Sequence, residues 1–170
     1  MEKDRREGRH PSQSYKEDEL LYDVLDLWIA GQETTAITVL WGLMHLIKNP
    51  SVIEKIRAEL HLITNGNRSV SLSDKDHTPY LNWTVLFDPG RYEEGGKELE
   101  QRIIPFGIGK RSCIGETLAK AEIYLILANM ISRYNIREDP EVPIDLKTTT
   151  PIGMMHRPRN FNIILELLKY

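Results

Sequence analysis

Residues 106–115 read FGIGKRSCIG and contain Cys113, the only cysteine of this 170-residue chain. The three glycines of the stretch allow positive φ angles and let a flat, bulky group approach the backbone closely. An apolar segment with helical spacing begins directly afterwards, which predicts that Cys113 lies at a helix N-terminus. The unpaired N–H groups and the helix dipole favour a thiolate there, the form of cysteine that binds metals or attacks carbon.

Five positions of this stretch follow the pattern F-x-x-G-x-R-x-C-x-G. A lone cysteine is more often a small buried hydrophobe than a ligand, but this pattern is specific, and it resembles the haem-ligand loop of the cytochrome P-450 family. The resemblance implies haem b, iron protoporphyrin IX, as the cofactor, with Cys113 as the thiolate ligand of its iron, which promotes cleavage of the O–O bond. It also implies that Arg111 faces a haem propionate and that Phe106 shields the thiolate from water. The cofactor-binding positions of the loop are Phe106, Gly109, Arg111, Cys113 and Gly115.

A second long segment, residues 16–48, has no proline and is apolar on most faces, which predicts one long buried helix. At 1.5 Å per residue such a helix spans roughly 45 to 50 Å. Asp26 and Glu33 lie within it and oppose insertion into a bilayer, so a core helix is favoured over a membrane span. The charged residues 1–15 contain no apolar run and are expected to form a solvated lead-in rather than a signal peptide.

The middle of this segment reads AGQETT at residues 30–35. Thr34 is expected to donate a hydrogen bond to the carbonyl of Ala30, and the small residues to leave a groove. Packing against another helix is the simpler interpretation of the pattern alone. However, A-G-x-[DE]-T-T also resembles the oxygen-binding groove of the same family. That resemblance implies Glu33 and Thr34 as the catalytic acid–alcohol pair that orders water for proton delivery, with Ala30 beside the haem.

Capping and periodicity predict further helices at residues 50–62, opened by Asn49 and Pro50, and at 114–133, which carries a wide apolar face. Residues 152–156 and 161–165 are predicted to pair as a hairpin. The expected fold is therefore mainly α with a small β hairpin. The resemblance makes residues 1–170 a single partial cytochrome P-450 domain, the truncated C-terminal part of that fold. It also implies that Ile152, Gly153 and Met154 form a turn over the substrate.

The resemblance is interrupted after Asn82. The family continues there into a helix with the pattern E-x-x-R, whereas this chain reaches FDPGRY at residues 87–92 almost at once. Arg91 has consequently lost the partners that the family places around it. Glu54 and Arg57 also fit the short E-x-x-R string, and they are expected to form an exposed i,i+3 pair on their own helix.

The net charge and the cysteine count exclude several other classes of function. A net charge of −3 with scattered basic residues offers no field for nucleic acid, and one cysteine excludes an internal disulfide or a multi-cysteine zinc site. No dinucleotide fingerprint is present. The resemblance therefore implies a haem-thiolate monooxygenase that inserts one oxygen atom of O2 into a small apolar substrate. It implies electrons from NADPH-cytochrome reductase and a location at the endoplasmic reticulum membrane. The acids within residues 16–48 and the lack of an apolar run before them predict no membrane span within this chain.

Two alternatives stay open. The missing region favours an inactive truncated fragment or an interaction module without bound haem. A cysteine nucleophile activated by a histidine is the other alternative, although none of the five histidines lies in a recognisable context. Because a porphyrin is retained only when both of its faces are enclosed, the chain as it stands is expected to bind haem weakly or not at all.

Overall fold

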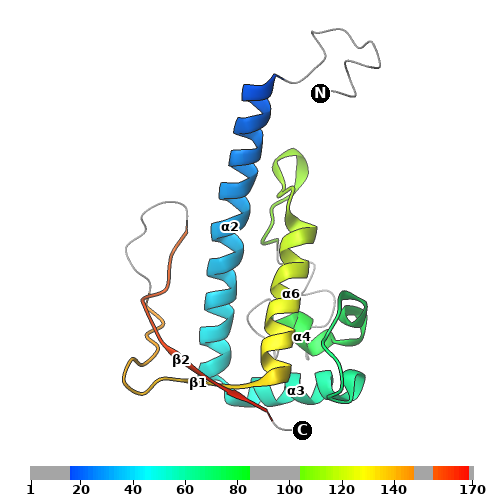
Figure 1. The fold of residues 1–170 in the computed structure, drawn as a ribbon, viewed down its shortest axis with the longest axis vertical. Coiled ribbons are helices and arrows are strands. Elements are labelled where there is room, and N and C mark those ends of the chain that lie inside the picture. The colour runs from blue at the N-terminus through cyan, green and yellow to red at the C-terminus, as the bar shows by residue number, and fades with distance from the viewer. Residues whose placement is uncertain (1–15, 85–103, 148–154, 169–170) are drawn as a thin grey trace. The chain divides into compact units, whose positions relative to one another are not determined.

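The computed structural model describes residues 16–84, 104–147 and 155–168 (Figure 1). The predicted fold class is confirmed, because helices dominate this part of the chain and a two-stranded sheet accompanies them. The elements in chain order are α2 (Glu17–Lys48), α3 (Pro50–Thr64), the 3-10 helix η2 (Leu72–His77), α4 (Pro79–Thr84), the 3-10 helix η3 (Gly109–Arg111), α6 (Glu116–Arg133), β1 (Tyr134–Glu138) and β2 (Ile163–Leu167). The chain divides into two compact units, Met1–Thr34 and Thr35–Tyr170.

Helix α2 runs without a break from one unit into the other, as predicted. Three acidic residues in its first turn complement the positive end of the helix dipole. The expectation that the whole helix is buried was wrong, because the large apolar side chains from Leu20 to Ile29 are all exposed. An apolar surface on every side of a helix needs neighbours all around it, and only the C-terminal half of α2 belongs to a packed core. The buried residues of α2 are Ile37, Val39, Leu43, Met44, Leu46 and Ile47.

The core of the second unit lies between the C-terminal half of α2, helix α3 and helix α6. Gly42 allows α2 to approach α6 closely, since a Cβ at that position would lie 3.4 Å from Leu127 Cδ1. The buried residues of α3 are Ile53, Ile56, Leu60 and Thr64. The corresponding buried residues of α6 are Ile123, Tyr124, Leu127, Ala128 and Ile131.

The ends of α3 show how local sequence sets its length. Pro50 occupies the first turn, where the missing N–H costs nothing. Asn49 holds the N-cap position, but its side chain donates to the carbonyl of His45 at the end of α2 (2.8 Å). At the other end Asn65 adopts a left-handed conformation with φ of 49°, which stops the helix before Gly66.

Strand β2 begins at Ile163, two residues later than the predicted strand 161–165, and it pairs with β1 rather than with the predicted strand at residues 152–156. The pairing is antiparallel, places Ile136 opposite Leu165, and is visible beside α3 in Figure 1. Residues 152–154 lie outside the described residues, and 155–156 belong to no strand. Strand β1 continues directly from α6 and buries Ile136 in the core, so the pairing is fixed by packing that a local apolar pattern does not encode.

The described helices differ in how far their length and apolar character suit a membrane span. No single helix among them combines the length and the apolar character that crossing a bilayer requires. Helices α2 and α3 satisfy that criterion only when taken together, and they are bent by 106° relative to each other.

A candidate haem-ligand loop

The stretch at residues 106–115 forms an irregular loop with a single turn of 3-10 helix, η3, in its middle. Gly107 and Gly109 both adopt a φ of 74°, a conformation that residues with a Cβ rarely take. The backbone N–H of Cys113 donates to the carbonyl of Phe106 at 2.9 Å, and that of Ser112 donates to the carbonyl of Gly109 at 3.2 Å. These two bonds close the loop and set the position of Cys113.

Cys113 is an exposed free cysteine. Its Sγ lies 3.9 Å from the point where a Cβ on Gly115 would stand, so the absence of a side chain there leaves the sulfur accessible. Helix α6 begins at Glu116 with Gly115 as its N-cap, two residues later than the predicted start at residue 114. The correction arises because Ile114 and Gly115 form a turn between the cysteine and the helix.

Large apolar side chains near Cys113 in the sequence are exposed as well. Their exposed fractions are 52% for Ile104, 75% for Ile108, 86% for Ile114 and 64% for Leu118. A Cβ placed on Gly109 would meet no atom within 4 Å, so the loop backbone is open. An accessible thiol on an open glycine backbone, flanked by apolar side chains, fits an iron ligand beneath a flat apolar porphyrin.

Phe106 and Lys120 connect the loop to the first turns of α6. The Lys120 ammonium lies 5.3 Å from the centre of the half-buried Phe106 ring, within the range of a cation–π contact. The same ammonium pairs with Glu116 at 2.6 Å. Arg111 is exposed. Its predicted contact with a haem propionate, and the shielding of the thiolate by Phe106, stay predictions.

The other predicted site stretch lies on α2 in the first unit. Thr34 Oγ1 donates to the carbonyl of Ala30 at 2.8 Å, which confirms the predicted bond. Glu33 and Thr34 are both half-buried. Because this stretch and the Cys113 loop belong to different units, their predicted juxtaposition around a haem stays a prediction. The predicted substrate turn Ile152, Gly153 and Met154 lies outside the described residues, as does Arg91.

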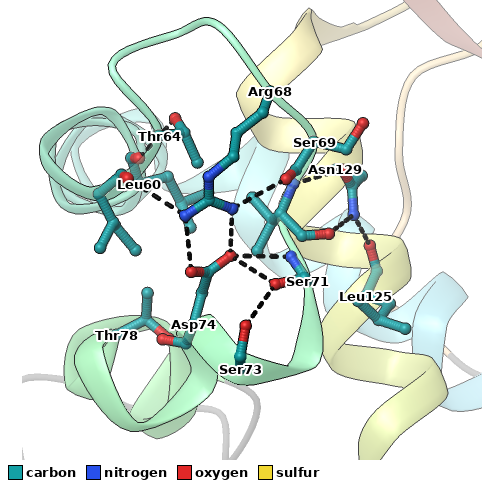
Figure 2. Close-up of polar contacts among 12 residues, drawn as sticks. Leu60, Thr64, Arg68, Ser69, Ser71, Ser73, Asp74, Thr78, Leu125 and Asn129 are labelled. Atoms are coloured by element: carbon teal, nitrogen blue, oxygen red, sulfur yellow. Dashed lines mark hydrogen bonds and ion pairs between the residues drawn. The ribbon is translucent and has the colours of Figure 1, made fainter.

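Sequence reasoning missed a buried polar cluster in the loop between α3 and α4 (Figure 2). Asp74 is only 6% exposed and accepts two bonds from the Arg68 guanidinium, at 2.6 and 2.8 Å. The backbone N–H and the hydroxyl of Ser71 donate to the same carboxylate at 2.9 and 3.0 Å. The bonds from Arg68 and then from Ser71 hold the pKa of Asp74 well below its usual range. The spacing S-x-x-D at residues 71–74, that of a capping box, was the available signal.

Asn129 connects that loop to α6, the helix that follows Cys113. Its Oδ1 accepts from the N–H of Val70 at 3.0 Å, while its Nδ2 donates to the carbonyls of Val70 and Leu125 at 3.1 and 2.9 Å. Figure 2 shows Asn129 between the loop and the helix. The loop is thereby fixed to the element that positions the cysteine.

Arg57 does not form the predicted pair with Glu54. Its Nε and Nη2 instead donate to the carbonyls of Ile131 and Tyr134, at 3.3 and 3.2 Å. The last carbonyls of a helix have no partner within the helix, so a guanidinium that reaches them from α3 caps α6. This interaction outweighs an exposed pair on the surface of α3.

The start of α4 is fixed in a similar way. The Glu59 carboxylate accepts the backbone N–H groups of Tyr80 and Leu81 at 2.9 and 3.0 Å, which satisfies two donors of the first turn. Beside it the hydroxyls of Thr78 and Tyr124 share a hydrogen bond of 3.0 Å, and burial raises the pKa of Tyr124. Helix α4 is thus held firmly up to the point where the family pattern is interrupted.

Comparisons with known proteins agree with this geometry. The family model for cytochrome P450 matches residues 1–86 and 84–165. Probable cytochrome P450 cyp-35D1 of Caenorhabditis elegans is 34% identical over 190 residues, covering 80% of this chain and 38% of the relative. Human cytochrome P450 2U1 is 28% identical over 223 residues, covering 98% of this chain and 40% of the relative. A solved structure of a zebra fish cytochrome P450 with abiraterone matches in fold with a TM-score of 0.82 at 22% identity, over 95% of this chain and 52% of that one.

The chain spans about two fifths of the length of these curated relatives. Both alignments are longer than its 170 residues, so the relatives carry residues that have no counterpart here. The two segments matched by the family model meet at residues 84–86, at the end of α4, close to the point where the sequence analysis finds the family's E-x-x-R helix missing. With a family model matched along nearly its whole length and a relative at 34% identity, this chain belongs to the cytochrome P450 family.

Proposed function

We propose that this chain carries the haem-binding C-terminal part of a haem-thiolate monooxygenase that inserts one oxygen atom of O2 into a small apolar organic substrate. The observation that carries the proposal is the exposed Cys113 on a glycine loop closed by its own bond to the Phe106 carbonyl. Family membership supports the same chemistry. When bound, haem b supplies the activation of O2 and the transfer of one oxygen atom.

Each loop residue has a distinct part in holding the cofactor. Cys113 provides the thiolate ligand of the iron, and Arg111 pairs with a propionate. Phe106 keeps water from the sulfur, and the contact of the Lys120 ammonium with its ring helps to fix the ring's position. Gly109 and Gly115 leave the space through which the porphyrin reaches the backbone.

Two residues of α2, Thr34 and Glu33, position the water that delivers protons. Thr34 donates its hydroxyl proton to the Ala30 carbonyl, so its oxygen is oriented to accept a hydrogen bond from a water molecule. Glu33, the adjacent residue, supplies the carboxylate that passes protons to that water. Ala30 would lie beside bound haem, and Ile152, Gly153 and Met154 would contact the substrate. NADPH-cytochrome reductase is the electron donor, at the endoplasmic reticulum membrane.

A second candidate is a truncated fragment that holds no haem and has no activity. The residues missing after α4 favour it, and so do the exposed apolar side chains on the N-terminal half of α2. A porphyrin enclosed on one face only is lost to solvent, and a thiolate open to water is readily protonated or oxidised.

A haem titration in the presence of dithionite and carbon monoxide separates the two candidates. The 170-residue chain should show little of the red-shifted Soret band that a thiolate-ligated carbonyl complex gives. A chimera that carries the extra residues of the worm relative after Thr84 should show more of it, and Cys113→Ala in the chimera should remove it.

Two outcomes decide against parts of the proposal. A band that survives Cys113→Ala in the chimera shows that Cys113 is not the ligand. A stable band from the 170-residue chain, with product formed once reductase is supplied, shows that the fragment alternative is wrong.

A further inference from the structure

A cavity of about 360 Å³ opens in the second unit at the ends of α3 and α6, next to β2. Its lining includes Arg57, His61, Arg68 and Arg133. None of the described residues that line it is an aspartate or a glutamate. The chain as a whole has a net charge of −3. Cationic side chains are therefore concentrated in one hollow of an otherwise slightly acidic chain.

No carboxylate of the described residues balances the charges of two of these arginines. Arg68 is paired twice with Asp74, so its charge is compensated. Among the residues that the structure describes, Arg57 donates only to backbone carbonyls, and Arg133 donates to the hydroxyl of Ser69. In the part of the chain that the structure describes, neither Arg57 nor Arg133 forms an ion pair with an acid. Two guanidinium charges thus line one cavity with neutral partners, an arrangement that attracts an anion.

The chemistry of the lining points to the kind of anion. A phosphate monoester carries about 1.5 to 2 negative charges at neutral pH, which two guanidinium groups can balance. The planar guanidinium also matches the oxygen spacing of a phosphate. The Ser69 hydroxyl and the Asn67 amide line the same hollow as additional polar groups, and Leu167 and Leu168 provide an apolar wall.

We propose that this cavity binds the phosphate monoester group of an organic ligand, with Arg57 and Arg133 supplying the charge and the two leucines contacting the apolar part next to the phosphate. The site is separate from the haem-ligand loop. Arg133 ends α6, whereas the loop precedes its first residue, Glu116, and the helix between them is roughly 25 Å long. The inference consequently does not depend on haem binding.

Isothermal titration of the 170-residue chain with phenyl phosphate tests the site. Arg133→Gln is expected to weaken binding about tenfold or more, because a charge-assisted hydrogen bond to phosphate is lost. Arg133→Lys should lose less, since the charge is kept. The matched control is Arg137→Gln, which removes an arginine paired with Glu166 on the strands and outside the cavity lining, and it should leave the affinity within about twofold. Circular dichroism establishes that each variant is folded.

Two further probes distinguish the source of the phosphate. Cosedimentation with phosphatidylcholine vesicles that contain phosphatidic acid, lost in Arg133→Gln, identifies a lipid headgroup. Binding of phenyl phosphate without cosedimentation identifies a soluble phosphate monoester. Equal losses in Arg133→Gln and Arg137→Gln overturn the proposal, because they indicate general charge attraction. The absence of binding by the folded chain to both probes overturns it as well.

Discussion

Asn129 and Val70 are joined by two hydrogen bonds that run in opposite directions, from the Val70 N–H to the Asn129 side chain and from that side chain back to the Val70 carbonyl, at 3.0 and 3.1 Å. The two residues are 59 positions apart, so the pair fixes the loop between α3 and α4 to helix α6. It needs both the oxygen and the nitrogen of the amide. Among side chains, only the amides of asparagine and glutamine provide this combination.

Asn129→Asp is therefore expected to lower the free energy of unfolding by about 1.5 to 3 kcal/mol at neutral pH. The substitution replaces the donor nitrogen by a charged oxygen that would face the carbonyls of Val70 and Leu125. Urea unfolding followed by circular dichroism measures the change. Asn160→Asp, at an exposed position, is the control and should stay within about 0.5 kcal/mol. Equal effects at the two positions would show that the reciprocal pair is not what matters.

Asp74 should make stability depend on pH in a defined direction. Because Arg68 and Ser71 hold its pKa below the usual value, ionised Asp74 stabilises the folded state at every pH above that usual value, about 3.9. The stabilisation is lost as pH falls from there towards the lowered pKa of the folded state. The unfolding free energies of wild type and Asp74→Asn should thus differ by about 1 to 3 kcal/mol at pH 7 and pH 5, and by less at pH 3.

Urea titrations at those three pH values make the measurement, with the exposed Asp76→Asn as control. A difference between wild type and Asp74→Asn that grows on acidification would contradict the assignment.

Much of the helical framework could be predicted because its signals are local. Pro50 marks the start of α3, and an apolar period marks the inner faces of α3 and α6. The strand pairing could not be predicted in this way. Several short apolar segments compete for a partner, and burial of Ile136 in the core decides which of them pairs.

The candidate site also combines features that local sequence predicts with contacts that it does not predict. The Cys113 loop follows from a pattern of neighbouring residues, as does the bond from Thr34 to Ala30. The contact of Lys120 with Phe106 and the bonds of Asn129 join residues that are distant in sequence. Their polar side chains read as solvated surface when only the sequence is considered.

Gly109→Ala and Gly31→Ala should change stability in opposite directions although a Cβ has open space at both positions. Gly109 has a φ of 74°, so alanine should cost roughly 1 kcal/mol in backbone strain. Gly31 lies inside α2, where alanine should favour the helix by about 0.5 to 1 kcal/mol. Thermal unfolding reports the first change and helicity by circular dichroism the second. A loss in both variants would mean that contacts rather than backbone conformation decide the outcome.

Arg57→Ala should destabilise the chain by about 1 to 3 kcal/mol, since two carbonyls at the end of α6 lose their donor. Glu54→Gln, one turn away on the same helix, is the matched comparison and should change the free energy of unfolding by less than about 0.5 kcal/mol. Chemical unfolding of both variants measures these changes in the free energy of unfolding. If Glu54→Gln is as harmful as Arg57→Ala, the exposed i,i+3 pair was the correct interpretation after all.

The bond from Arg57 to Ile131 also sets an order of events during synthesis. Its acceptor lies 74 residues further along the chain. At translation rates of about 5 to 20 residues per second, the ribosome adds that acceptor roughly 4 to 15 s after Arg57 itself. During this interval α3 exists without the helix that it caps, and its apolar face is open to chaperones and proteases. A pause in translation between the two segments would lengthen that exposure, so codon choice between them can affect how much folded protein a cell obtains.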